Sequence, residues 1–223
     1  MKKKEYYKHI LPHFQQPGQA YFVTWSLRDA VPPKALKRYS AKLESIKARL
    51  DENNRGSESA TPGDAAQSSL LKEYHTIRRK YIRAYNHLLD TENHATVNLS
   101  RPANLMVMIE ALNFWHSARL ENYAFCIMPN HVHWVFRLFE KTERGDAVYS
   151  EDILYSVKRF SAGKINALEG RTGALWQKES FDKTIRDDRH LYHAIEYTLN
   201  NPVLGGLVKN RNDWPGNYEN TAI

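Results

Sequence analysis

The chain has 223 residues, enough for one fair-sized domain or for one domain that carries a large insertion. Hydrophobic residues make up 42% of it and aromatic residues 12%, which supports a packed core and argues against wholesale disorder. The 32 Lys and Arg residues outnumber the 25 Asp and Glu residues, so the formal net charge is +7. This excess favours a polyanionic partner, nucleic acid first and an acidic membrane surface second.

Cysteine content and hydropathy bear on the cellular compartment. The single cysteine, Cys126, cannot form an internal disulfide, which is typical of a reducing compartment, and its apolar neighbours predict a buried, inert thiol. The first residues are basic but lead into no apolar run, so no signal peptide is predicted. No window approaches the roughly 18 apolar residues of a membrane span. The sequence therefore predicts a cytoplasmic protein without a membrane partner.

The first third of the chain predicts one strand followed by a helical insertion. Residues 21–27 are rich in aromatic and β-branched side chains, which is typical of a core strand. Apolar residues at steps of three and four then predict two helices within residues 34–91. Between them, residues 51–69 are rich in Asn, Gly, Ser and Asp, which predicts a mobile loop. We therefore expect a single domain over residues 1–223 with an inserted helical hairpin at 34–91.

The rest of the chain predicts alternating helices and strands. We expect a helix at 102–120, strands at 123–128 and 131–138, and a helix at 150–168 with Ser150 as its N-cap. A strand within 175–185 is followed by a helix that begins at Asp187 or Asp188 and stops near Pro202, and the tail reads as irregular. This order predicts an α+β fold, most simply a ferredoxin-like antiparallel sheet with helices on one side.

Two histidines in the predicted strand at 131–138 could bind a metal ion. Side chains alternate between the faces of a strand, so His131 and His133 project the same way, roughly 7 Å apart along the strand. Two imidazoles at this spacing can hold one divalent metal ion. An isolated His-x-His pattern more often reflects two histidines that happen to share a sheet face. The pattern becomes informative only with a third ligand.

The last predicted helix offers that ligand together with a nucleophile. Tyr197 and Asn201 are four residues apart and therefore share one helix face. The Asn201 amide oxygen would complete two imidazoles into a site suited to Mg²⁺ or Mn²⁺. Because Pro202 disfavours helical angles at the preceding residue, Asn200 is the fallback ligand. A tyrosine hydroxyl has a pKa near 10, but beside a metal ion it can act as a covalent nucleophile.

Other residues compete for these roles. The chain has 13 tyrosines, so a helical tyrosine at the protein surface is the plain alternative for Tyr197. Tyr155 and Tyr192 are the competing nucleophiles. His193 lies one turn before Tyr197 and is a candidate proton shuttle, although a solvated histidine is the more common interpretation.

The motifs resemble those of a known family. The segment Met128-Pro129-Asn130-His131-Val132-His133 resembles the HUH motif (His, hydrophobe, His) of small single-tyrosine transposases. The segment at 175–187, the run from Tyr197 through Asn201 and Pro202, and the residues at 206–208 and 213–215 are also similar. The combination is most like the REP-associated tyrosine transposases and covers residues 21–27 and about 99–215. The stretch at 34–91 is longer than in compact members of that family.

The resemblance implies a specific chemistry. It implies a divalent metal ion, Mg²⁺ or Mn²⁺, held by His131, His133 and Asn201. It also implies that Tyr197 forms a 5′-phosphotyrosine link and releases a 3′-hydroxyl. The substrate implied is single-stranded DNA whose imperfect palindromes fold as hairpins, processed by a monomer or a homodimer. The implied function is that of a metal-dependent endonuclease and strand transferase in DNA transposition and recombination.

Basic residues indicate where DNA could bind. On the predicted helix at 150–168 we expect Lys158, Arg159 and Lys164 to bind phosphates near the site, and Arg186 to do so just before the catalytic helix. A denser basic strip on the inserted hairpin is a candidate accessory surface; it consists of Lys72, Arg78, Arg79, Lys80 and Arg83.

Two other functions fit part of the pattern. The first is a non-catalytic nucleic-acid-binding module, in which a ferredoxin-like sheet stacks bases on exposed aromatics such as Trp25, Phe125 and Trp134. The second is a replication-initiator nuclease of the same HUH chemistry. Such nucleases often pair two tyrosines on one helix, whereas Tyr192 and Tyr197 are five residues apart and point in different directions.

Overall fold

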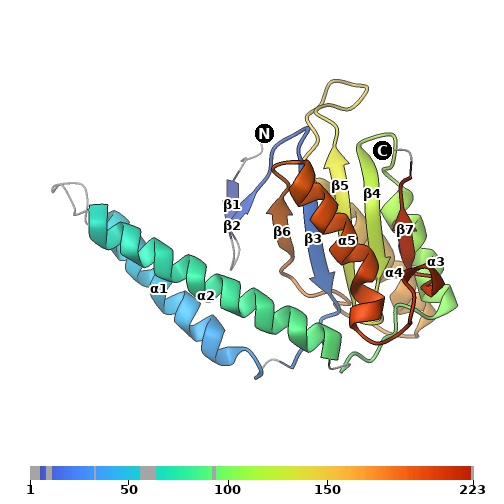
Figure 1. Cartoon of the computed structure of the whole chain (residues 1–223), viewed down its shortest axis with the longest axis horizontal. Coiled ribbons are helices and arrows are strands. Elements are labelled where there is room, and N and C mark those ends of the chain that lie inside the picture. Colours follow the sequence, from blue (N-terminus) through green and yellow to red (C-terminus); the bar gives the residue numbers. More distant parts are fainter. Residues whose placement is uncertain (1–5, 9–11, 33, 56–63, 92–93, 222–223) are drawn as a thin grey trace. The chain divides into compact units, whose positions relative to one another are not determined.

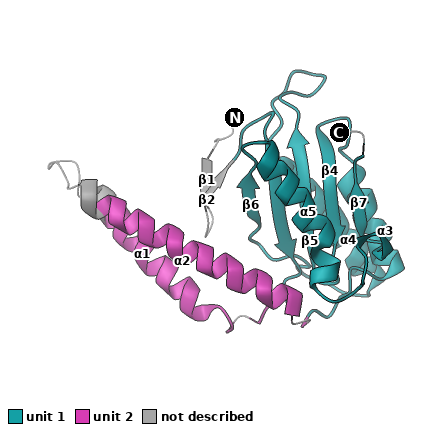
Figure 2. Ribbon diagram, in the orientation of Figure 1, with its two compact units in different colours: residues 1–30, 95–223 teal, residues 31–94 magenta. Residues whose placement is uncertain are grey.

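The computed structural model describes the chain except for residues 1–5, 9–11, 33, 56–63, 92–93 and 222–223. By its internal contacts the chain divides into two compact units, one made of residues 31–94 and the other of residues 1–30 and 95–223 (Figure 2). The second of these, here the larger unit, contains all of the chemistry-bearing motifs. No helix in the described part of the chain is long and apolar enough to cross a membrane.

The larger unit is built on one antiparallel sheet of five strands. Their order across the sheet is β6 (Phe181–Thr184), β3 (Ala20–Ser26), β5 (His131–Leu138), β4 (Leu120–Ile127) and β7 (Asn217–Glu219). Helix α3 (Pro102–Asn113) lies on the connection from β3 to β4, which also includes residues 31–94, and helix α4 (Ser150–Leu168) connects β5 to β6. Two interlocked strand–helix–strand units of this kind form the ferredoxin-like arrangement. The predicted α+β class with an antiparallel sheet is confirmed.

Helices cover both faces of the sheet. The crossover helices α3 and α4 pack together on one face, and α5 (Asp188–Leu204) lies across the other (Figure 1). Consecutive side chains of β5 point to opposite faces of the sheet. The Trp134 indole N–H donates to the Asn122 side chain, which in turn donates to the backbone of α3, whereas Val135 packs with residues of α5. The expectation of helices on one side therefore holds for the crossover helices and is wrong for α5, whose own apolar stripe packs on the free sheet face.

Three local predictions are corrected. The helix expected at 102–120 ends at Asn113, because the chain turns at residues 114–119 before β4 begins. Ser150 is not the N-cap of α4, since Tyr149 holds that position and forms no capping hydrogen bond with its side chain. Asp187, one of the two residues expected to begin α5, caps that helix by accepting a hydrogen bond from the His190 backbone N–H. The tail forms a short helix, η2 (Arg211–Asp213), and the strand β7. A two-stranded sheet of β1 (Tyr6–Lys8) and β2 (Pro12–Phe14) precedes β3 in the chain.

The smaller unit is a pair of helices, α1 (Lys37–Arg55) and α2 (Asp64–Thr91), within the stretch where the hairpin is predicted. Their shared apolar contact consists of Leu43, Ile46, Leu70, Tyr74 and Ile77. The loop predicted at 51–69 is wrong for 51–55 and 64–69, which are helical, and its centre at 56–63 lies outside the described residues. Polar residues in the terminal turns of two long helices misled the prediction, because such turns need few apolar contacts.

Candidate active site

The two histidines of β5 face each other under helix α5. His131 and His133 are both fully buried, and their Nε2 atoms are 3.0 Å apart. Burial lowers the pKa of His131 to about 3, an effect that the nearby Asn201 amide partly opposes. Burial also lowers the pKa of His133 well below its usual value, and the neighbouring His131 adds to the shift. Both imidazoles are therefore neutral at physiological pH, which is the form that binds metal ions.

A polar side chain holds the other ring nitrogen of each histidine. The Nδ1 atom of His131 is 2.7 Å from the Asn130 Oδ1 atom, which only accepts hydrogen bonds, so the proton of this imidazole lies on Nδ1. The Nδ1 atom of His133 is 2.7 Å from the Thr24 hydroxyl, which can donate or accept. When the Thr24 hydroxyl accepts a hydrogen bond from Nδ1–H of His133, both Nε2 atoms can present a lone pair to the same metal ion. Sequence reasoning missed Asn130 and Thr24.

Asn201 supplies an amide at the same place. It is buried on α5, and neither polar atom of its side chain forms a well-aligned hydrogen bond within the described part of the chain. The amide nevertheless lies close enough to both imidazoles to raise the pKa of each. A buried amide without a partner costs about 1–3 kcal/mol of stability. Such a cost is typical of a position kept for binding.

The last turn of α5 fixes the position of the Asn201 side chain. We expected Pro202 to push Asn201 out of helical geometry, and this is wrong, because both residues lie within α5. The last turn closes through a hydrogen bond from the Gly205 N–H to the Asn201 carbonyl (2.8 Å), and Gly206 then reverses the chain with a φ of 69°. Asn200 instead donates to the Glu196 side chain and backbone, which removes it as a fallback ligand.

Tyr197 lies beside the histidine pair and is half-buried. Its ring centroid is 5.3 Å from that of His133 in an edge-on contact, and 5.8 Å from that of Phe22, also edge-on. Phe22 in turn stacks on His133 at 5.7 Å. The three rings come from β3, β5 and α5, so Phe22 fixes the tyrosine ring next to the imidazoles. The structure therefore brings together Tyr197, His131, His133 and Asn201.

The donor set fits a hard divalent ion. Two ligands at right angles, each about 2.1 Å from an ion, are about 3.0 Å apart, which matches the spacing of the two Nε2 atoms. The unpartnered Asn201 amide can add an oxygen, and three protein ligands leave room for water or phosphate oxygens. Among the described residues, no group of three His, Cys, Asp or Glu side chains could hold a metal. The proposed site has only two such side chains, and its third ligand is an asparagine amide.

The competing residues lie elsewhere. Tyr155 on α4 and Tyr192 near the start of α5 are 63% and 61% exposed, and the ring contacts of Tyr192 are with His193. His193 is itself exposed on α5. Cys126 is buried, and burial raises the pKa of its thiol, as expected for an inert cysteine.

The basic residues of α4 do not share a face with Tyr197. We expected Lys158, Arg159 and Lys164 near the site, but α4 covers the opposite side of the sheet from α5 (Figure 1). Lys158 is half-buried and donates to the Ser180 hydroxyl at 2.6 Å, and desolvation of its amine lowers the pKa of Lys158 to about 8. Lys158 thus anchors the segment before β6, whereas Arg159 and Lys164 are exposed. Arg186 is exposed just before α5, on the connection that leads to Tyr197.

The basic strip of the smaller unit follows α2. Arg78 is partly buried, and the other four cations are exposed; they are Lys72, Arg79, Lys80 and Arg83. The role of this strip in DNA binding stays a prediction.

The fold and the site together define a class of protein: a ferredoxin-like domain with a paired-imidazole and amide site beside a helical tyrosine. Comparisons with known proteins agree with it. The chain is 30% identical over 103 residues to a protein of Haemophilus influenzae named "Putative REP-associated tyrosine transposase", covering 43% of this chain and 56% of that protein. It is also 30% identical over 94 residues to the REP-associated tyrosine transposase of Escherichia coli K12, covering 41% and 50% respectively.

The resemblance drawn from the motifs is therefore confirmed: the chain is similar to REP-associated tyrosine transposases. It spans about half the length of the curated relatives it matches. Among solved structures, it aligns with a REP-associated tyrosine transposase bound to a REP hairpin, at a TM-score of 0.44 and 16% identity, over 92% of this chain and 79% of that one. No protein-family model matches the chain.

Proposed function

We propose that this protein is a transposase-like, metal-dependent endonuclease and strand transferase that cuts single-stranded DNA near hairpins through Tyr197. The observation that carries the proposal is the contact of the Tyr197 ring with His133, at a site where two imidazoles and a buried amide converge. The similarity to curated REP-associated tyrosine transposases supports the same reaction class.

His131, His133 and Asn201 would hold Mg²⁺ or Mn²⁺. When bound, such an ion draws negative charge from a phosphate group and stabilises the oxygens that gain charge as a P–O bond breaks. Thr24 and Asn130 keep both Nε2 atoms turned toward this position, so the ligands are oriented before binding. The buried, neutral imidazoles would then lose little binding energy to protonation at physiological pH.

Tyr197 would carry out the covalent step. Its hydroxyl loses its proton to solvent, and the Oη atom attacks the phosphorus of the scissile phosphodiester. A bond forms between Oη and phosphorus, the bond between phosphorus and the 3′ oxygen breaks, and that oxygen takes a proton to become a 3′-hydroxyl. The 5′ end stays on Tyr197 as a phosphotyrosine. Phe22 limits the motion of the tyrosine ring, which favours attack from one direction.

Rejoining is the reverse reaction with a different strand. A 3′-hydroxyl attacks the phosphotyrosine, a new phosphodiester forms, and Tyr197 recovers its hydroxyl proton. One phosphodiester is exchanged for another through the phosphotyrosine, so no nucleotide cofactor is needed. A single tyrosine therefore suffices for both cutting and strand transfer.

The aromatic residues that a base-stacking binding module would need on its sheet are not exposed. The three aromatics named for that role, Trp25, Phe125 and Trp134, are each at most 1% exposed. Helices on both faces cover the strands that would have formed such a platform (Figure 1). A non-catalytic role would therefore need a different nucleic-acid surface.

The test is a search for a covalent protein–DNA adduct. The protein would be incubated with labelled single-stranded DNA from beside its own gene, including any palindromes, with Mn²⁺, and separated on a denaturing gel. We expect a slow-migrating band that requires metal, is absent in Tyr197→Phe and persists in Tyr192→Phe, which alters an exposed tyrosine of the same helix. Hairpin binding should survive in Tyr197→Phe. An adduct that persists in Tyr197→Phe would refute Tyr197 as the nucleophile.

A further inference from the structure

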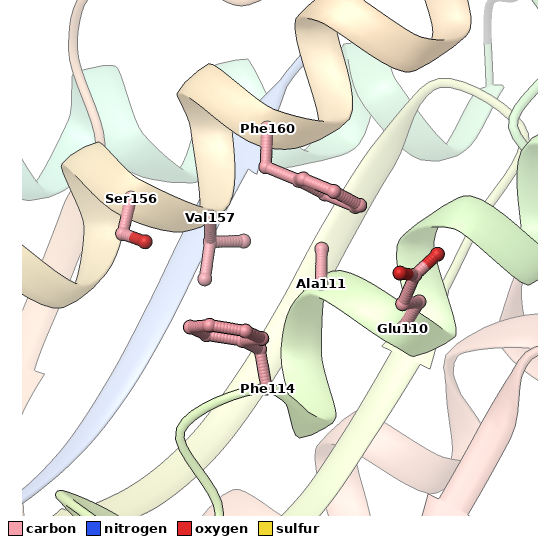
Figure 3. A pocket seen from close by; sticks show the side chains of 6 residues that line it. All are labelled: Glu110, Ala111, Phe114, Ser156, Val157 and Phe160. Carbon is pink, nitrogen blue, oxygen red and sulfur yellow. The ribbon is translucent and has the colours of Figure 1, made fainter.

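A slot with two aromatic rings in its lining lies between α3 and α4. It has a volume of about 120 Å³ and is lined by Glu110, Ala111, Phe114, Ser156, Val157 and Phe160. The rings of Phe114 and Phe160 lie on either side of Ala111 and Val157 (Figure 3). The slot lies on the face of the sheet opposite Tyr197, and nothing in the reaction proposed above uses it.

Phe114 is held in an exposed position by its neighbours. It is 66% exposed at the end of α3, and its ring packs edge-on against Trp115 with centroids 4.6 Å apart. The Trp115 indole N–H in turn donates to the Ser156 hydroxyl of α4 at 3.1 Å. This bond ties the two helices together at the slot. Exposed at this position, the Phe114 ring forms part of the wall of the slot.

A basic hollow adjoins the slot along α4. Its volume is about 500 Å³, and Phe160 and Ser156 line it as well as the slot. The Arg159 guanidinium lies 5.9 Å from the ring centre of Tyr155 and donates to its hydroxyl, and the Lys164 ammonium lies 5.8 Å from the ring centre of Phe160. Neither cation is paired with a carboxylate among the described residues. Flat rings interleaved with unpaired cations are typical of single-stranded nucleic-acid surfaces.

We propose that this slot binds an unpaired base of single-stranded DNA, stacked between Phe114 and Phe160, while Arg159 and Lys164 bind the flanking phosphates. This rests on the proposed function for the identity of the ligand as DNA. The Glu110 carboxylate at the slot repels phosphate but can accept hydrogen bonds from the exocyclic amino group of a base, as carboxylates do with cytosine. The base therefore enters the slot and the backbone remains in the basic hollow.

Such a site would bind the DNA substrate at a second place, away from Tyr197. Because α4 and α5 cover opposite faces of the sheet, a strand held here would be cut only where it passes around the domain to Tyr197. Duplex DNA cannot place a stacked base in the slot, so the site would select unpaired segments next to hairpins. The expectation that Arg159 and Lys164 bind DNA is kept, but away from the catalytic face.

The test compares two exposed apolar residues of the same helix. Fluorescence anisotropy would measure the affinity of Phe114→Ala and of Met106→Ala, which is 65% exposed on α3 and does not line the slot, for a labelled oligodeoxycytidine of about 16 nucleotides. We expect Phe114→Ala to bind it about 5- to 100-fold more weakly, as the loss of one stacked base predicts. Phe114→Trp and Met106→Ala should bind normally. A duplex of equal length should show no difference between Phe114→Ala and the unaltered protein.

A second readout locates the base directly. Ultraviolet cross-linking of an oligonucleotide that carries 5-iododeoxycytidine, followed by peptide mapping, should label Phe114 or Phe160. Unchanged affinity in Phe114→Ala, with cross-links elsewhere, would overturn the proposal. So would a change in the protein's mass in sedimentation without a change in affinity, because the slot would then be an interface between copies of the chain.

The covalent-adduct assay separates this proposal from the catalytic one. At saturating DNA, Phe114→Ala should still form the Tyr197 adduct, since the slot lies on the other face of the sheet. Binding that depends on Phe114 in a protein that never forms an adduct would refute catalysis and support the slot. An adduct in the unaltered protein, with binding independent of Phe114, would do the reverse.

Discussion

Strand β5 presents different chemistry to the two faces of the same sheet. Toward α5 it places His131 and His133, whose Nδ1 atoms are held by Asn130 and Thr24 and whose Nε2 atoms face each other beside the Asn201 amide. Toward α3 and α4 it places Trp134, whose ring meets Trp25 at 6.1 Å and whose indole N–H donates to Asn122 at 2.8 Å. On the α3–α4 face the indole N–H of Trp134 is satisfied within the fold, whereas that of Trp25 forms no hydrogen bond among the described residues. On the α5 face one buried amide is left without a partner.

The difference separates stability from function within one strand. A satisfied buried polar group adds modestly to stability, whereas an unsatisfied one costs free energy that the rest of the fold must offset. The α3–α4 face should therefore dominate the free energy of unfolding, and the α5 face should dominate metal binding. Four substitutions test whether the two contributions are as separate as the structure indicates.

Trp134→Ala should have the largest effect on stability. It removes a fully buried indole and leaves the Asn122 carbonyl without its donor, which should lower the free energy of unfolding by about 3–5 kcal/mol. Urea denaturation followed by circular dichroism would measure the loss. Arg137→Ala, an exposed position on the same strand, should change it by less than about 0.5 kcal/mol. A loss under 1 kcal/mol for Trp134→Ala would show that the face does not carry the stability assigned to it.

Asn201→Leu should raise the stability of the fold while it weakens metal binding. Replacing an unsatisfied buried amide by an apolar side chain of similar size should raise the free energy of unfolding by about 1 kcal/mol. The same change removes one of three proposed ligands, so Mn²⁺ affinity by titration calorimetry should fall by more than about 100-fold. Asn200→Leu, the neighbouring amide bonded to Glu196, should keep its metal affinity. Unaltered Mn²⁺ binding in Asn201→Leu would eliminate this amide as a ligand.

Thr24→Val should weaken metal binding without removing a ligand. Valine keeps the shape of threonine but cannot hydrogen-bond to Nδ1 of His133, so the imidazole loses the group that orients it. We expect Mn²⁺ affinity to fall by about 10- to 100-fold. Thr24→Ser should restore most of it. A matched change on β6, Thr184→Val, should have no effect, and equal affinities in Thr24→Val and the unaltered protein would contradict the positioning role.

Lys158→Met should change only how the free energy of unfolding depends on pH in the alkaline range. Burial lowers the pKa of Lys158 to about 8 in the folded protein, below the value of about 10.4 expected when it is unfolded. Between these values the unfolded chain binds the additional proton, so stability rises with pH from about 8 to about 10.4. Lys158→Met should remove this contribution, on the order of 1–2 kcal/mol, from denaturation curves taken across that window. If the free energy of unfolding varied with pH in the same way for Lys158→Met and the unaltered protein, Lys158 would have an ordinary pKa.

Local patterns in the sequence already determined much of the site. The alternation of a strand puts His131 and His133 on one face, and the pitch of a helix puts Tyr197 and Asn201 on another, whatever the rest of the fold does. The same local rules predicted β5 and α4 with the boundaries found in the structure. They failed where contacts between distant segments decide the outcome. The strand β7 pairs with β4, about 90 residues earlier in the chain, and Tyr218 stacks on Phe125 at 4.8 Å between ring centres.

Only the tertiary structure decided which partners meet. The pairing of β3 with β5 sets Thr24 opposite His133, and no periodicity within either segment fixes that register. The packing of α5 on the sheet face opposite α3 and α4 brings Asn201 to the imidazoles and takes Arg159 and Lys164 away from them. Local sequence fixes the direction of a side chain relative to its own backbone. Long-range packing fixes which side chains meet, because it depends on how apolar surfaces of distant segments are buried together.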